Sequence, residues 1–112
     1  MKTMNDIIEY CQTLPGIYVD NPFDETSTAI RHTGNKKMLL LMFYRNDSLW
    51  VNLKCEPMKA DFWRRVYKSV IPGYHMNKTH WNSVILDESI EPEVIKEMIN
   101  DSYDLTKGKL KL

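Results

Sequence analysis

The segment from Tyr74 to Asn82 carries the densest set of side chains that can do chemistry. It supplies imidazoles, amides, an ammonium group and aromatic rings from Tyr74, His75, Asn77, Lys78, His80, Trp81 and Asn82. Such groups contact phosphates, stack on bases and form hydrogen bonds with base edges. They also suit a structural role, in which a Pro72-Gly73 turn lets Tyr74 and Trp81 fill the edge of the core. For the two aromatic residues we favour the structural role, and for Asn77 and Lys78 both roles stay open.

Residues 31–80 form a basic block inside a chain of zero net charge. The block holds ten Lys or Arg against three Asp or Glu, so the two ends together carry a matching excess of acids. If folding gathers these cations on one face, that face attracts an anionic partner. If folding mixes the blocks, charges of both signs alternate over the surface. The basic residues with no obvious partner are Lys36, Lys37, Arg45, Arg64, Lys68 and Lys78, whereas Asp61 and Arg65 are spaced to pair on a helix.

Catalytic and metal-binding chemistry has little support in the sequence. A metal site needs about three converging ligands, and His75 and His80 lie in one loop with only Cys55 as a distant candidate. A nucleophilic Cys55 would need a lowered pKa and a neighbouring base, but it falls on the apolar side of an alternating segment. The glycines are scattered, so there is no phosphate-binding loop. We therefore expect a protein that is not an enzyme, with no catalytic residues, metal or cofactor.

The length of 112 residues favours a single domain spanning residues 1–112. The longest apolar run, Met38 to Tyr44, is too short to cross a membrane, and the first residues do not resemble an export signal. Two cysteines are too few for a disulfide scaffold, so we expect free thiols and a cytoplasmic protein with no membrane association. The oligomeric state stays open, with a monomer slightly favoured.

Helical periodicity predicts three helices. Thr3 caps the first, with Asp6 as the capping-box acid and Pro15-Gly16 as the stop. Glu56-Pro57 opens the second, for which spacing predicts a buried stripe of Phe62, Val66 and Val70. Pro92 opens the third, with Gly108 as its end cap. The apolar stripes predicted for the first and third helices are Ile7, Ile8, Cys11 and Leu14, and Ile95, Met98, Ile99, Ser102 and Tyr103.

Strands are predicted over residues 28–32, 37–44, 49–55 and 81–86. Short turns join the first three, which should therefore form an antiparallel meander. The element order indicates an α+β two-layer sandwich, with helices packed on an antiparallel sheet of about four to five strands. Residues 107–112 are expected to be a frayed tail.

Several motifs together resemble one family. They are Pro72-Gly73-Tyr74-His75-Met76-Asn77-Lys78-Thr79-His80-Trp81-Asn82, Val51-Asn52-Leu53-Lys54-Cys55-Glu56-Pro57, Pro15-Gly16 with Pro22-Phe23, and the ending Ile99 to Leu105. On these residues the chain resembles the MmcQ/YjbR family, from the first helix to about Leu105. The resemblance implies a CyaY-like fold and DNA binding through paired loops. It does not transfer iron binding, because the first helix offers only Asp6 and Glu9 as carboxylates.

Our first hypothesis is a non-enzymatic DNA-binding protein that contacts duplex phosphates through the basic block and the Tyr74–Asn82 loop. The candidate DNA-binding residues are Lys36, Lys37, Arg45, Arg64, Lys68, His75, Asn77, Lys78 and His80. The alternative is an interaction domain that binds a protein or a small ligand in a groove near Tyr74 to Trp81. The alternative gains if charges alternate on the folded surface and the loop lines a concave apolar pocket.

Overall fold

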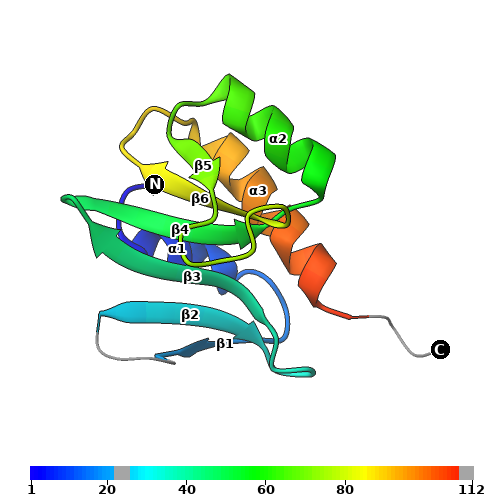
Figure 1. Ribbon diagram of the computed structural model, residues 1–112. Coiled ribbons are helices and arrows are strands. Elements are labelled where there is room, and N and C mark those ends of the chain that lie inside the picture. Colours follow the sequence, from blue (N-terminus) through cyan, green and yellow to red (C-terminus); the bar gives the residue numbers. More distant parts are fainter. Residues whose placement is uncertain (22–25, 109–112) are drawn as a thin grey trace.

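A six-stranded antiparallel sheet carries three helices on one of its faces (Figure 1). This arrangement is that of a computed structural model, which describes residues 1–21 and 26–108. The elements in chain order are α1 (Met4–Cys11), β1 (Ile17–Asp20), β2 (Ser27–His32), β3 (Met38–Arg45), β4 (Ser48–Lys54), α2 (Pro57–Val66), β5 (Val70–Pro72), β6 (Trp81–Leu86) and α3 (Pro92–Thr106). The strand order is β1-β2-β3-β4-β6-β5, so the predicted meander forms the middle of the sheet. The predicted α+β sandwich is therefore confirmed.

Helices α1 and α3 begin where the sequence predicts, but α1 ends at Cys11, with Gln12 as its C-cap, before Leu14 and the predicted stop at Pro15-Gly16. Thr3 caps α1 and forms a capping box with Asp6, whose carboxylate accepts from the Thr3 backbone N–H at 3.0 Å. The core residues of α1 and α3 are Ile7 and Cys11, and Ile95, Met98, Ile99, Ser102 and Thr106. Gly108 follows α3 with a φ of +80°, the left-handed conformation of a glycine that ends a helix.

The predicted C-terminal tail is ordered at its first residue. Lys107 is the C-cap of α3 and its ammonium lies 3.2 Å from the Asp104 carboxylate, so the predicted frayed tail does not begin there. Residues 109–112 of that tail, and the Pro22-Phe23 motif, lie outside the described residues. Within the described ranges, no helix has the length and apolar character needed to cross a membrane.

The sheet has more strands than the four to five predicted. The two missed strands, β1 and β5, lie at its edges and have only four and three residues. Neither segment is long enough to show a clear alternation of apolar and polar residues. Val70, predicted to belong to a helix stripe, is instead a buried residue of β5.

The predicted buried stripe of α2 is also wrong. Ala60 and Trp63 are buried, whereas Phe62 and Val66 are 52% and 50% exposed. The helix ends at Val66 because Tyr67 takes an extended conformation that leads into β5. Because position 70 lies in β5, Phe62, Val66 and Val70 do not form one stripe along a helix. The indole of Trp63 packs into the core in their place.

The two faces of the sheet differ. Side chains such as Met42, Val51 and Val84, which are neighbours across three strands, belong to the core shared with the helices. The opposite row, one residue along, contains Leu41, Asn52 and Ser83. These residues are also buried, although the helices pack on the other side. The loop between β5 and β6 covers this second face. We call it the open face because the helices pack on the other one.

His32 makes the stability of the fold depend on pH. His32 is 4% exposed, and its Nε2 lies 2.7 Å from the hydroxyl of Thr106. Burial lowers the pKa of His32 below its ordinary value, although a backbone hydrogen bond near Tyr103 opposes this shift. The unfolded chain therefore binds more protons, and stability is lost as the pH falls below the ordinary histidine value of about 6.5.

We expect the free energy of unfolding to decrease as the pH is lowered from about 7.5 toward 5.5. Urea denaturation at several pH values would measure it. The His32→Gln variant should show a weaker pH dependence over the same range, because its side chain does not titrate. Equal slopes for the two proteins would contradict a buried neutral imidazole.

Candidate functional site

The loop over residues 73–80 is fixed to the open face of the sheet by buried polar groups. The Tyr74 backbone N–H donates to the Ser83 hydroxyl at 2.8 Å, and the Asn52 amide donates to the Tyr74 carbonyl at 3.0 Å. Ser83 in turn donates to the Asn52 side-chain oxygen at 2.5 Å. Gly73 is needed at the start of the loop, since a Cβ there would lie 2.8 Å from the Cβ of Trp81. Position 74 is therefore held on strands β4 and β6 through both of its backbone polar groups.

The Tyr74 ring completes an aromatic cluster with two sheet residues. Its centroid lies 5.8 Å from that of Phe43 and 5.6 Å from that of Trp50. The guanidinium of Arg45 lies 4.6 Å from the Tyr74 centroid and 5.5 Å from the Trp50 centroid. A stacked guanidinium keeps its N–H groups available at the edges of its plane, where they can bind a carboxylate or a phosphate. Arg45 is exposed, and no carboxylate among the described residues pairs with it.

A groove of about 380 Å³ adjoins this cluster. Its lining residues include Leu41, Phe43 and Tyr44 of β3, with Tyr74 and His75 of the loop on the other side. The His75 backbone has a φ of +59°, a conformation uncommon in residues other than glycine, and its ring lies 4.1 Å from Tyr74 edge to face. We refer to this groove with Arg45 as the Arg45 groove. Apolar and aromatic side chains and the His75 imidazole line the groove, and the Arg45 cation lies beside it over the Tyr74 ring.

The predicted cations at the hairpin ends do not form one patch. Lys36 and Lys37 precede β3, whereas Arg45 ends it, so the length of the strand separates them. At about 3.3 Å per residue, that separation is about 25 Å. In Figure 1 the turn between β2 and β3 and the turn between β3 and β4 lie at opposite ends of the sheet. A single phosphate-binding face made of Lys36, Lys37 and Arg45 is therefore not present.

Two candidate DNA-binding cations have structural partners, contrary to expectation. The Arg64 guanidinium donates to the Asn82 side-chain oxygen at 2.6 Å, to the Trp81 carbonyl at 3.2 Å and to the Lys78 carbonyl. The Lys78 ammonium donates to the Gly73 carbonyl at 2.8 Å, across its own loop. Arg64 thus ties α2 to β6, and Lys78 closes the loop.

The remaining candidates are dispersed. The Asn77 side-chain oxygen accepts from the backbone N–H groups of Thr79 and His80, at 2.9 and 3.1 Å, which gives this amide a role in the turn. His80 is exposed next to β6. Lys68 is exposed beyond α2, beside Ser69, whose hydroxyl donates to the Asp87 carboxylate. Of the predicted residues, the structure brings only Arg45 and His75 to the Arg45 groove.

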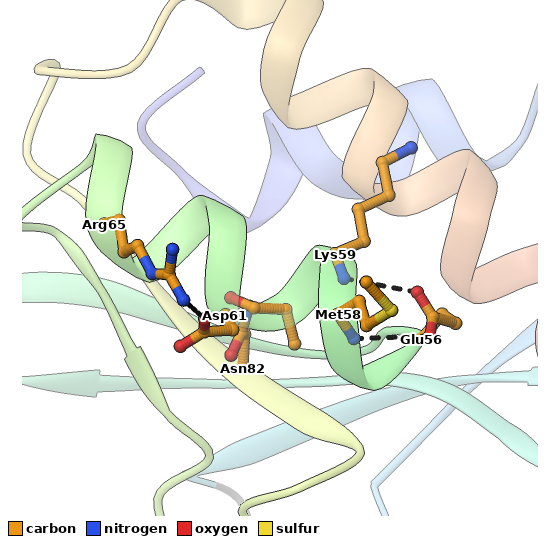
Figure 2. Close-up of polar contacts among 7 residues, drawn as sticks. Glu56, Met58, Lys59, Asp61, Arg65 and Asn82 are labelled. Atoms are coloured by element: carbon orange, nitrogen blue, oxygen red, sulfur yellow. Dashed lines mark hydrogen bonds and ion pairs between the residues drawn. The ribbon is translucent and has the colours of Figure 1, made fainter.

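Other cations of the basic block pair with acids. Arg31 lies 2.9 Å from Asp20, and Lys59 lies 2.6 Å from Asp101 and 2.9 Å from Glu97 on α3. The predicted pair between Asp61 and Arg65 is confirmed and is visible in Figure 2. Folding therefore pairs Arg31 and Lys59 of the basic block with acids from the two ends of the chain.

The cysteine thiols are buried and unactivated. Burial raises the pKa of Cys11 to about 12 and is the main cause that raises the pKa of Cys55 to about 11. Both are free thiols, and a thiolate is needed for nucleophilic attack. Across residues 1–21 and 26–108, no group of three His, Cys, Asp or Glu side chains converges as metal ligands would.

Phe43 and Trp50 are the site residues that sequence reasoning missed. A signal for Trp50 was present, because alternation places it opposite Leu49 and Val51, on the side away from the core. An aromatic side chain on a strand's outer side is a candidate contact surface. The anchoring role of Asn52 and Ser83 had no such signal, since it depends on a loop that arrives from elsewhere in the chain.

Comparisons with known proteins agree with this architecture. The YjbR family model matches residues 12–105. The uncharacterized protein YyaQ of Bacillus subtilis is 33% identical over 119 residues, covering 96% of this chain and 100% of its own. The uncharacterized protein YjbR of Escherichia coli K12 is 29% identical over 102 residues, covering 90% of this chain and 84% of its own.

Two solved structures have the same fold. The crystal structure of Deinococcus radiodurans protein DR2400 has a TM-score of 0.89 at 31% identity, covering 97% of this chain and 81% of that one. A crystal structure of a protein from Pseudomonas syringae has a TM-score of 0.81 at 27% identity, covering 93% of this chain and 98% of that one. The family model, the full-length relative and the shared fold lead to one conclusion: the chain belongs to the YjbR family, as the MmcQ/YjbR motifs indicated.

Proposed function

We propose that this protein is a non-enzymatic DNA-binding module that holds an unpaired stretch of strand in the Arg45 groove. A base stacks against the ring surfaces of Phe43 and Tyr74, and a neighbouring phosphate binds the edge of the Arg45 guanidinium. The observation that carries the proposal is Arg45 itself, stacked 4.6 Å from the Tyr74 centroid beside a groove of about 380 Å³. Aromatic surfaces next to a cation are the usual combination in proteins that bind single strands.

An unpaired strand fits the charge distribution better than a duplex does. Duplex binding without base contacts relies on several cations on one face, each neutralising a phosphate. Here Arg64 and Lys78 donate to protein carbonyls, and the Lys36–Lys37 pair lies at the other end of β3 from Arg45. Stacking of unpaired bases on aromatic rings adds affinity, so a single strand can bind with fewer phosphate contacts than a duplex needs. The free, buried thiols fit the cytoplasm, where we propose that the protein acts.

Replacing Arg45 by alanine is expected to weaken binding of an unpaired oligothymidine by about ten- to a hundredfold, since a charge-assisted contact contributes about 1.5–3 kcal/mol. The log–log salt slope should flatten by about 0.7, the contribution of one contact on a single strand. The Arg45→Lys variant should keep the slope but lose affinity, because lysine keeps the charge without the planar stacking. Fluorescence anisotropy at three salt concentrations measures both quantities.

The matched control replaces Lys36 and Lys37 together by alanine, which removes two exposed cations about 25 Å from Arg45. That variant should bind the oligothymidine as the parent does. A duplex of the same length should bind more weakly than the single strand. A flattened slope in the control with an unchanged slope in Arg45→Ala would refute the Arg45 groove as the binding site.

The interaction-domain alternative keeps one specific observation in its favour. The loop lines an apolar groove whose volume is that of a small-molecule site, through Tyr74 and His75. The two proposals differ in their response to a free nucleotide. If thymidine monophosphate binds as tightly as the oligothymidine, the groove serves a small ligand and not a DNA strand.

A further inference from the structure

Helix α2 presents three apolar side chains to solvent at a spacing of four residues. Met58 is 80% exposed, Phe62 is 52% exposed and Val66 is 50% exposed. At 100° per residue they lie on the side of α2 away from the buried Ala60 and Trp63. We call these three residues the α2 stripe. A contiguous apolar surface of this kind marks an interaction site more often than chance exposure does.

Charged groups border the α2 stripe on one flank. Asp61 and Arg65 lie one turn apart along that flank and form an ion pair with each other (Figure 2). Both side chains are at least half exposed, so both can reach a partner. On the other flank, Lys59 is directed toward α3 (Figure 2). There its ammonium forms ion pairs with Glu97 and Asp101. The available charges are therefore one acid and one base, in that order along the helix.

We propose that the α2 stripe is a dimer interface in which α2 packs antiparallel against α2 of a second copy. A two-fold axis between the helices, near their midpoints, reverses the direction of one helix and keeps the charged flanks on the same side. Asp61 of each copy then faces Arg65 of the other, and Met58 packs near Val66 across Phe62. Such an interface is isologous, with the same surface used by both copies.

Self-complementarity is the reason for choosing a second copy as the occupant. In the antiparallel arrangement, Asp61 of each copy lies opposite Arg65 of the other, so both pairs have opposite charges. In a parallel two-fold pair the charged flanks would lie on opposite sides, and these contacts would not form. Since three side chains make a small patch, the dimer should be weak and dependent on protein concentration.

Charge reversal gives the sharpest test, using sedimentation velocity of the full chain over a concentration series. The parent protein should shift from monomer toward dimer as the concentration rises. Arg65→Asp places acids opposite acids and Asp61→Arg places bases opposite bases, so each should raise the dimer dissociation constant at least tenfold. The double variant, Asp61→Arg with Arg65→Asp, should restore association, because the base at position 61 of each copy then faces the acid at position 65 of the other.

An equimolar mixture of the two single variants should associate more tightly than either variant alone. Thermal unfolding of each variant checks that the fold is intact. In a second arm, Phe62→Asp should abolish the dimer. Val19→Asp, at a 42% exposed position on β1, should leave it unchanged. A parent protein that stays monomeric at millimolar concentration would overturn the proposal, as would a mixture that behaves like its separate components.

Discussion

Replacing Trp63 by alanine is expected to lower the free energy of unfolding by about 3–5 kcal/mol, the usual cost of deleting a large core aromatic. Trp63 is 8% exposed and belongs to the core, and its ring stacks on that of Tyr67 at 6.0 Å. It is the large apolar residue of α2 that packs into the core between the helix and the sheet. Urea denaturation followed by far-ultraviolet circular dichroism would measure the change.

The neighbouring residue provides a matched control. Phe62→Ala also removes an aromatic ring, from a 52% exposed position, and should cost about 1 kcal/mol or less at low protein concentration. The structure predicts a larger loss of unfolding free energy for Trp63→Ala than for Phe62→Ala. The helical pattern in the sequence, which places Phe62 in the buried stripe, predicts the opposite. A larger loss for Phe62→Ala than for Trp63→Ala would mean that α2 is rotated from the orientation described.

Replacing Asn82 by alanine is expected to cost about 2–4 kcal/mol. Asn82 is 3% exposed, and its amide donates to the Ala60 carbonyl at 3.2 Å while its oxygen accepts from Arg64 at 2.6 Å. The substitution removes a charge-assisted hydrogen bond and leaves a buried carbonyl without its partner. Both lost contacts join α2 to β6, so the helix itself should become less firmly attached.

A double-mutant cycle with Arg64→Ala identifies the contact responsible. The coupling energy between positions 64 and 82 should be about 1–3 kcal/mol, because the two side chains touch. Asn100→Ala serves as the control, since this exposed amide accepts one hydrogen bond from Tyr10 at 2.7 Å and should cost about 1 kcal/mol or less. Zero coupling between Arg64 and Asn82 would free Arg64 for a role in ligand binding.

The parts of the fold that follow from sequence are those with strong local signals. The Thr3 capping box, the Pro92 start of α3 and the apolar strand after Lys37 each combine periodicity with a clear boundary residue. The parts that do not follow depend on tertiary contacts. Strand β5 is three residues long and exists because it pairs with β6. The choice of Trp63 over Phe62 for the core depends on which face α2 turns toward the sheet, which is a tertiary contact.

The candidate site was predictable in composition but only partly in arrangement. The motif around Tyr74 and His75 does lie at the groove, and Arg45 does lie at the end of a hairpin. The strand predicted over residues 37–44 already separates Lys36 and Lys37 from Arg45 by its length, so this part of the arrangement does follow from the sequence. Sequence position could not indicate that Arg64 and Lys78 would find partners among backbone carbonyls, since those carbonyls come into reach only in the folded chain.

A nuclear magnetic resonance titration of the ¹⁵N-labelled protein with an unpaired oligothymidine would locate the DNA-binding surface residue by residue. We predict that shift changes concentrate at the Arg45 groove, in the backbone of residues 43–45 and 74–75 and in the Arg45 side chain. The backbone of Lys36 and Lys37 serves as the internal control and should not move. Shift changes concentrated at Lys36 and Lys37, with the Arg45 groove unaffected, would contradict the account.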